Sequence, residues 1–227
     1  MKRIVTTLAL LAICASTSFA ANALRISQAY GGGGGSTGTY LRDYVELFNS
    51  SSADIDISGY TIEYGSATGN WGSSTGNIFT FPAGTKVKAC GYLLIECGAS
   101  GTAGSALPVT ADYVTSAISA SATNGKMGLF SQLNSAIACG SETGLIDKMA
   151  YGTGSCAEGT AVAALNSTTV AVRNNGGLTD TDANNLDFTN TSTGSIAPRN
   201  SASAINPSCT VVPTRKSNWG AVKSIYR

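Results

Sequence analysis

The 227-residue sequence contains no histidine. Histidine is the usual base of Ser-His-Asp and Cys-His nucleophilic sites and a common ligand of catalytic zinc, so its absence excludes these hydrolase classes. The phosphate-binding loop pattern is missing too. Two carboxylates can hydrolyse glycosides, but nothing in the sequence nominates a pair. We therefore predict a protein that is not an enzyme; the remaining enzymatic alternative is a cryptic hydrolase or an accessory to one.

Apolar runs long enough to cross a membrane are also missing. The apolar run at 4–14 is too short to span a bilayer, and it follows two positive charges. Small residues then offer cleavage after Ala20 or after Ala23, and we prefer Ala23 because the first predicted strand begins at the next residue. Residues 1–23 are therefore predicted to be a signal peptide. The mature chain should be secreted, periplasmic or at the cell surface, with no transmembrane segment.

Charged residues make up only 12% of the sequence, and no amphipathic helical stretch stands out. Short apolar runs alternate with clusters of glycine, asparagine and serine, which indicates an all-β sandwich. Residues 24–205 are long enough for one domain with a full core. The candidate strands lie near 24–30, 41–49, 54–64, 76–81, 91–97, 126–132, 145–151 and 168–173.

The densest run of strand-forming residues extends from Tyr40 to Tyr64. Alternation predicts that Val45 and Leu47 share one buried face, and it predicts burial of Ile57 and Ile62 further on. The alternation changes phase at Ser58-Gly59. A single extra residue turns every later side chain to the other face, so we predict a turn or bulge at Gly59.

Glu46 is a carboxylate between apolar neighbours within this run. A buried charge needs a partner, so one interpretation is a hydrogen-bonded strand residue near a loop. The alternative is a ligand-contacting or metal-binding role. The first interpretation is favoured.

Several segments, taken in order, resemble the bacterial lamin tail domain. They are LRISQAYGGGGG, DYVELFN with DISGYTIEY, GYLLIECGASGTAGSALP, DKMAYGTGSC, DTDANNLDF and APRNSAS, and they cover roughly Leu24 to Ser203. The resemblance implies an immunoglobulin-like β-sandwich and a module that is not an enzyme. It also implies occurrence in exported bacterial proteins, alone or beside nucleases and phosphatases, and in animal nuclear lamins.

Two glycine-rich stretches are expected to be loops. Gly31 to Gly35 lacks the helix start or lysine partner that a phosphate-binding loop needs, so we interpret it as a flexible connection. Trp71 lies in the second stretch, between Gly65 and Gly76. It could stack on a sugar ring or fold back to cap the sandwich, and we favour capping.

The acidic stretch DTDANNLDF places side-chain oxygens close together in the sequence. Asp180, Asp182, Asn184 and Asp187 could converge on calcium, although the glycine and glutamate of an EF-hand are missing from the required positions. Asx turns would also explain the pattern, and they are the favoured interpretation. A calcium site remains the functional alternative.

Five cysteines remain after the signal peptide, and an exported protein can form disulfides. Cys139 and Cys156 flank a predicted strand and loop and match cysteines of the lamin tail resemblance, which implies that they pair. Cys90 and Cys97 would be about 23 Å apart in one strand at roughly 3.3 Å per residue, too far for a bridge. Cys90 with Cys209 is a weaker preference, and one cysteine stays unpaired or bridges two chains.

Residues 206–227 differ in kind from the domain. They carry four positive charges and no acid, whereas 24–205 carries thirteen acidic and eight basic residues, a net charge of −5. A negative domain repels phosphate, which argues against nucleic-acid binding. The tail is either an unpacked terminus or a tag for sorting or surface contact.

These features together predict an exported structural or interaction module with an extracellular or envelope partner. The alternative is a surface-binding domain that depends on calcium or contacts carbohydrate, using Trp71 and the acidic stretch.

Overall fold

The computed structural model describes residues 23–209. Residues 1–22 and 210–227 lie outside the described part, and with them almost all of the predicted signal peptide and most of the predicted tail. The strands of the described part are β1 (Leu24–Tyr30), β2 (Asp43–Asn49), β3 (Ile55–Asp56), β4 (Thr61–Gly65), β5 (Ile78–Thr80), β6 (Lys86–Val87), β7 (Tyr92–Cys97), β8 (Tyr113–Val114), β9 (Gly125–Phe130), β10 (Leu145–Tyr151), β11 (Thr169–Arg173) and β12 (Phe188–Ser192). One short helix, α1 (Asn184–Asp187), and three 3-10 turns, Thr75–Asn77, Asn175–Gly177 and Thr193–Ser195, complete it.

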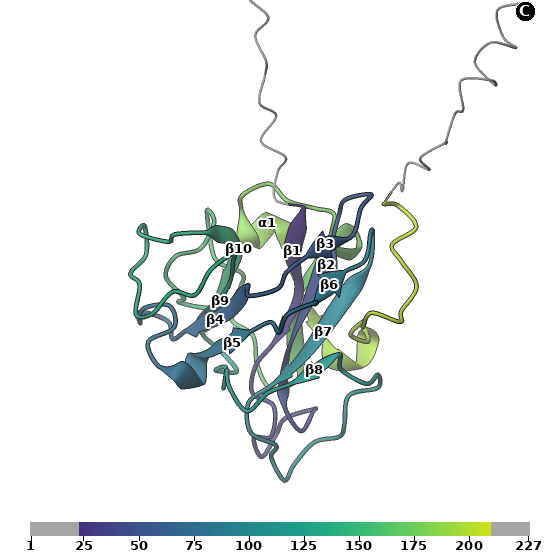
Figure 1. Ribbon diagram of the computed structural model, residues 1–227. Helices are drawn as coiled ribbons and strands as arrows, with labels where there is room; N and C mark the ends of the chain where they lie inside the picture. The colour runs from purple at the N-terminus through teal and green to yellow at the C-terminus, as the bar shows by residue number, and fades with distance from the viewer. Residues whose placement is uncertain (1–22, 210–227) are drawn as a thin grey trace, which may run out of the picture.

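These strands form two principal sheets, which Figure 1 shows from the side. The larger sheet has the order β12-β11-β1-β2-β7-β8, and all its pairs are antiparallel except β7 with β8. The smaller sheet has the order β10-β9-β4-β5 and is antiparallel throughout. A separate two-stranded sheet joins β3 to β6. This is the all-β sandwich that the sequence predicts.

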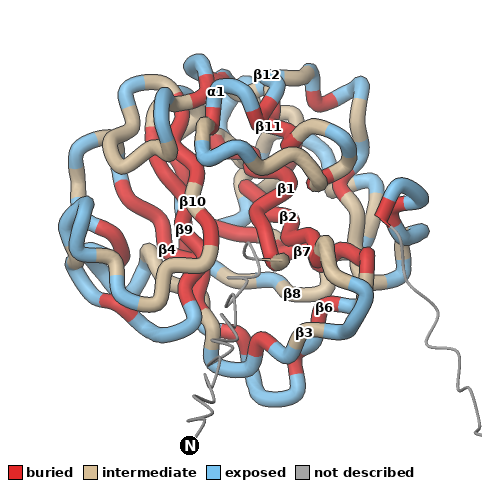
Figure 2. The backbone as a smooth tube through the Cα atoms, turned by 90° about the horizontal axis from the view of Figure 1, so that it is seen from above, coloured by how far each residue is buried: buried red, intermediate tan, exposed pale blue. Residues whose placement is uncertain are grey.

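The main core lies between the two principal sheets. It joins Ile26, Val45 and Leu47 of the larger sheet to Ile62 and Leu129 of the smaller one, all with almost no exposed surface. The buried stretches in Figure 2 run along the same strands. Burial of these aliphatic side chains supplies the main driving force for the fold.

Strand β2 is buried on both faces. Val45 and Leu47 enter the main core, whereas Tyr44 and Phe48 point to the other side, where they belong to two smaller clusters. Residues from 196–209 take part in both smaller clusters, so this last segment covers the outer face. Gly177 also approaches closely, and a Cβ at this position would lie 2.6 Å from the Phe48 ring.

The predicted strand at 54–64 is two strands that belong to different sheets. The chain turns at Gly59, whose φ of 77° is accessible to glycine without strain, and the turn sends β4 into the smaller sheet. The predicted strand at 76–81 is partly wrong, since a 3-10 turn precedes β5. Strands β6, β8 and β12 were not predicted because two are only two residues long and the third is largely polar. None of the helical segments within 23–209 has the length and apolar character to cross a membrane.

Burial leads to a stability prediction for the core. Val45 and Ile57 have no exposed surface. Val45→Ala or Ile57→Ala should each lower the free energy of unfolding by about 2–4 kcal/mol, through lost transfer energy and the cavity left behind. Val114→Ala is the matched control, because Val114 is 59% exposed, and it should change stability by no more than about 0.5 kcal/mol. Denaturant titration measures all three; equal losses for Val45→Ala and Val114→Ala would contradict the assignment.

Candidate functional site

Arg173, the last residue of β11, is the centre of a buried charge network. Its Nη2 donates two hydrogen bonds of 2.8 Å to both carboxylate oxygens of Asp147. Its Nη1 lies 3.3 Å from Asp180 and 3.6 Å from Asp187. Burial lowers the pKa of Arg173, but the nearby carboxylates more than offset this, so the net pKa is raised. Arg173 is therefore a permanent buried cation that neutralises carboxylates from β10 and from the acidic stretch.

A second guanidinium group, from β1, approaches one of these acids. Arg25 Nε lies 2.9 Å from Asp180. Single carboxylate oxygens of Asp147, Glu158 and Asp180 lie within 4.8 Å of one another, and we refer to these three residues as the carboxylate cluster. Oxygens at this spacing could hold a hard cation. Guanidinium groups already neutralise Asp147 and Asp180, so a metal ion would have to compete with them.

Of the four predicted calcium ligands, only Asp180 belongs to the carboxylate cluster. Asp187 is buried and accepts hydrogen bonds from the N–H and hydroxyl of Thr181, which closes a turn. The Asn184 side chain is buried against β10 and accepts a backbone N–H there. Asp182 is exposed, with a φ of 56°. Of the four, Asp187 thus closes a local turn, Asn184 contacts the backbone of β10, and Asp180 pairs with Arg25 and Arg173.

Glu158 is the member of the carboxylate cluster that lies in the loop between β10 and β11. Burial raises its pKa from 4.5 to about 8, and the negative charges of Asp147 and Asp180 add to the shift. Asn184 Nδ2 donates to Glu158 Oε2 at 3.2 Å. Glu158 therefore carries a proton at neutral pH, which reduces repulsion within the cluster. Neither Glu158 nor Asp147 was selected from the sequence, because each stands as a single acid in its own segment.

The raised pKa of Glu158 predicts a pH dependence of stability. Between about pH 4.5 and 8 the folded state keeps a proton that the unfolded state has released, so stability should fall as pH rises through this window. Glu158→Gln has no ionisable group at this position. Its free energy of unfolding should therefore fall less between pH 5 and pH 9 than that of the wild type. Urea titrations at pH 5, 7 and 9 measure the difference, with Glu96→Gln on β7 as control. If the free energy of unfolding changed with pH in the same way in the wild type and in Glu158→Gln, the raised pKa of Glu158 would be contradicted.

Glu46 lies on the outer face of β2, fully buried. Arg199 donates to both of its carboxylate oxygens, at 2.7 and 3.2 Å, and Ser27 Oγ donates at 2.6 Å. Burial raises the pKa of Glu46, and Arg199 opposes this shift. The Arg199 guanidinium also lies 3.7 Å from the centre of the Tyr92 ring. This is the predicted hydrogen-bonded strand residue, and its partner comes from the segment that covers the sheet.

Trp71 is buried and forms part of the interior. Its ring meets Phe130 edge to face with centroids 5.7 Å apart, and its Nε1 donates to Glu142 at 3.2 Å. With no exposed surface the ring has no free face for a sugar, so the stacking-platform alternative is wrong. The capping interpretation agrees with these contacts.

Lys126 and Ser155 form the pair that most resembles catalytic machinery. Lys126 Nζ donates to Ser155 Oγ at 2.7 Å, and burial lowers the pKa of the lysine. Lys126 Nζ also donates to the carbonyl of Gly69 and lies 5.4 Å from the Trp71 ring centre. The Ser155 N–H, which could have stabilised an oxyanion, donates instead to Ala67 O at 2.7 Å. The pair therefore has the contacts of a structural lysine that ties two loops together.

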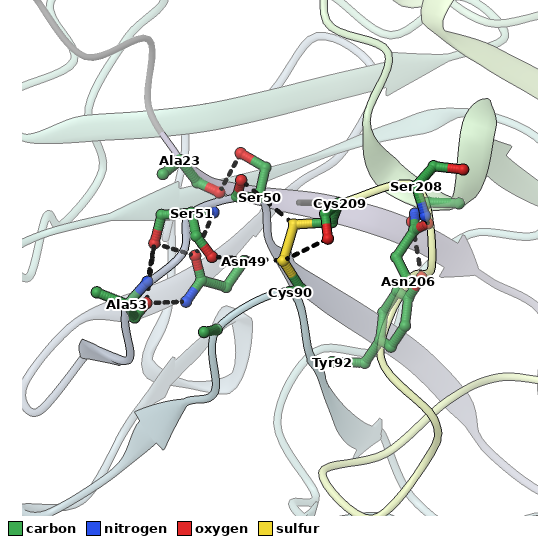
Figure 3. Close-up of a disulfide and its surroundings, with 12 residues drawn as sticks. Ala23, Asn49, Ser50, Ser51, Ala53, Cys90, Tyr92, Asn206, Ser208 and Cys209 are labelled. Carbon is green, nitrogen blue, oxygen red and sulfur yellow. Dashed lines mark hydrogen bonds between the residues drawn. A yellow bond between two sulfur atoms is a disulfide. The ribbon is translucent and has the colours of Figure 1, made fainter. Parts of the chain in front are cut away.

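Two disulfides tie loops to the sandwich. Cys139 and Cys156, the pair implied by the resemblance, have Cα atoms 5.3 Å apart. Cys90 and Cys209, the weaker preference, are also bridged, with Cα atoms 5.6 Å apart; Figure 3 shows this bridge beside the turn that follows β2. Cys97 at the end of β7 is free and buried, and burial raises the pKa of its thiol well above the ordinary value. Cys90 and Cys97 do not pair, as predicted from strand length.

An open hollow of about 740 Å³ lies between the turn that follows β11 and the last described segment. Asn206 Nδ2 donates to the carbonyls of Asn175 and Gly176, which ties the two sides together, and Tyr92 Oη also donates to Gly176 at 2.9 Å. Its lining combines apolar and hydrogen-bonding groups. The lining residues are Tyr92, Asn175, Gly176, Leu178, Thr179, Asp180, Thr181, Arg199, Ala204, Ile205, Asn206, Pro207 and Ser208.

Comparison with known proteins identifies a family. Among solved structures, the chain is similar to a DUF4876 family protein from Bacteroides thetaiotaomicron, with a TM-score of 0.36 and 10% identity over 58% of this chain and 54% of that chain, about half of its length. No curated protein matches the sequence. The family profile described as Lamin Tail Domain matches residues 17–212, which is most of the chain. The all-β sandwich, immunoglobulin-like as in that family, agrees with this match, and the chain belongs to the lamin tail domain family.

Proposed function

We propose that the protein is an exported, non-catalytic module that binds a partner outside the cytoplasm. Two disulfides support export, because such bridges form and persist in oxidising compartments. The signal-peptide pattern at 1–23 supports it from the sequence.

One observation supports a non-catalytic function above all. The charged side chains that could take part in catalysis already form contacts within the protein. The two buried arginines pair with carboxylates, and the buried lysine donates to a carbonyl and a hydroxyl. Such contacts stabilise one conformation, so these side chains have a structural role. Membership in the lamin tail domain family points the same way.

Export has a direct test. The full chain, expressed in a bacterial host with a periplasm, should be recovered from the periplasm or medium with Leu24 as its first residue. Peptide mapping without reduction should recover Cys90 linked to Cys209 and Cys139 linked to Cys156. A cytoplasmic protein with residues 1–23 retained would overturn the proposal.

Binding has a separate test. The mature protein should be retained by envelope fractions or an extracellular polysaccharide and should not bind duplex DNA at physiological salt, because the domain carries a net charge of −5. Retention on DNA that weakens steeply with salt would indicate a nucleic-acid function instead. Turnover of a polysaccharide or phosphoester in the same samples would revive the hydrolase alternative.

Calcium dependence remains a second candidate. It is favoured by the spacing of the carboxylate cluster, whose three ligand oxygens lie within 4.8 Å of one another. A ligand that binds only the folded state raises stability by mass action. If the cluster binds calcium, a millimolar concentration should raise the melting temperature, Glu158→Gln should abolish the rise, and Asp182→Ala should not. If only Asp182→Ala abolishes the rise, the ion binds in the acidic stretch. If the wild type has the same melting temperature in calcium and in chelator, the protein does not depend on calcium.

A further inference from the structure

The described chain ends at a fixed point on the rim of the hollow. Cys209 is buried and bridged to Cys90, and the Asn206 N–H donates to the Cys90 carbonyl at 2.9 Å. Pro207 and Ser208, the residues just before this anchor, line the hollow. Any segment that follows Cys209 must therefore start beside it.

The hollow presents apolar surface that no described residue covers fully. Leu178, Ala204, Ile205 and Pro207 contribute to its lining, and Ile205 is 48% exposed. A concave site of this size with apolar walls and a few hydrogen-bonding groups is typical of ligand and peptide sites.

Residues 210–227 have the composition and length to fill it. They contain Trp219 and Tyr226, several aliphatic residues, four basic residues and no acid. Trp219 is ten residues beyond Cys209, a span of up to about 33–36 Å when fully extended, so the indole can reach the hollow with slack. Tethering keeps the local concentration of the segment high, on the order of millimolar. Its positive charge complements the net charge of −5 on 24–205, including the exposed Asp182, which follows the lining residue Thr181 in the chain.

We propose that residues 210–227 dock in the hollow of their own chain, with Trp219 as the apolar anchor and the basic side chains beside the acidic stretch. The tail then covers the hollow and competes with any other occupant. This goes beyond the proposed function, because neither export nor partner binding requires the hollow.

Tryptophan fluorescence offers a test in the full mature chain, which has two tryptophans. Subtracting the spectrum of Trp219→Phe from that of the wild type isolates Trp219, since Trp71 contributes to both. The isolated emission should be blue-shifted and protected from acrylamide. Ile205→Asp places a charge in the hollow and should abolish both effects. Leu133→Asp is the matched control, because Leu133 is 60% exposed in the loop after β9, and it should change neither.

Three other outcomes would overturn the proposal that the tail docks in the hollow of its own chain. Solvent-like emission of Trp219 in the wild type would show that the tail is not docked. Protection that disappears on dilution would assign the tail to a second copy, and protection that survives Ile205→Asp would place it elsewhere. Ala204→Glu provides a second hollow variant if Ile205→Asp does not fold. None of these results affects the export and binding tests, so the two proposals fail independently.

Discussion

Replacing Arg173 by methionine should lower the free energy of unfolding by about 3–5 kcal/mol, because removing one partner of a buried ion pair leaves uncompensated buried charge. Asp147 would lose two hydrogen bonds of 2.8 Å, and Asp187 would lose its nearest cation. Methionine keeps the apolar part of the side chain but ends short of the guanidinium nitrogens, so the loss also includes the hydrogen bond from Arg173 Nε to the carbonyl of Ile26. Denaturant titration with both disulfides intact measures it.

Two controls separate this explanation from a general effect of removing arginine. Arg42→Met also removes a guanidinium, but Arg42 donates to main-chain carbonyls such as that of Gly98. Its loss should cost about 0.5–1.5 kcal/mol, as for an ordinary hydrogen bond. The double variant Arg173→Met with Asp147→Asn removes both charges of the closest pair and should be more stable than Arg173→Met alone by at least about 1 kcal/mol. Equal losses for Arg42→Met and Arg173→Met would falsify the central role of Arg173.

The principal strands could be predicted from the sequence because their burial follows local alternation. Val45 and Leu47 alternate with Tyr44 and Phe48, and the structure buries both sets on opposite faces of one strand. The phase change at Gly59 was visible for the same reason. The sequence could not show that the change separates two sheets, since the partners of a strand are set by contacts distant in the chain.

The acidic stretch can be recognised in the sequence, but the cations that pair with its carboxylates cannot. Asp180 meets Arg25 and Arg173, which come from β1 and β11, and the carboxylate cluster adds Glu158 from a loop. Oxygen spacing alone is the same for a calcium loop and for a turn that accepts N–H groups. What distinguishes them is whether cations from elsewhere in the fold already satisfy the acids, and only tertiary structure supplies that.

Glu46 shows the same limit, because its partner is also distant in the sequence. Its isolation among apolar residues indicated a buried, partnered carboxylate, yet the partner, Arg199, lies 153 residues later. Nothing in the local pattern around Arg199 marks it as a buried ion-pair partner. The segment that carries Arg199 also carries Asn206 and Cys209, both buried, so packing against the domain extends four residues past the predicted domain end at 205.

Removing the Cys90–Cys209 bridge should have the other large effect. A disulfide stabilises mainly by restricting the unfolded chain, and the restriction grows with the length of the closed loop. Cys90 and Cys209 are separated by 119 residues, whereas Cys139 and Cys156 are separated by 17. In the chain-entropy account these loops correspond to about 4–5 and about 3 kcal/mol. Alanine at both positions of a pair removes the bridge without leaving a lone thiol.

The double variant Cys90→Ala with Cys209→Ala should therefore be less stable than Cys139→Ala with Cys156→Ala by about 1–2 kcal/mol. Structure adds to the difference: Cys90 and Cys209 pack with Phe48 and Tyr92 on the outer face of β2, whereas Cys139 is exposed. Guanidinium titrations of both variants and the wild type, without reductant, give the comparison. If the 139–156 variant lost more, the long-range bridge would not be what holds the last segment against the sheet, and the hydrogen bonds of Arg199 and Asn206 would have to hold it alone.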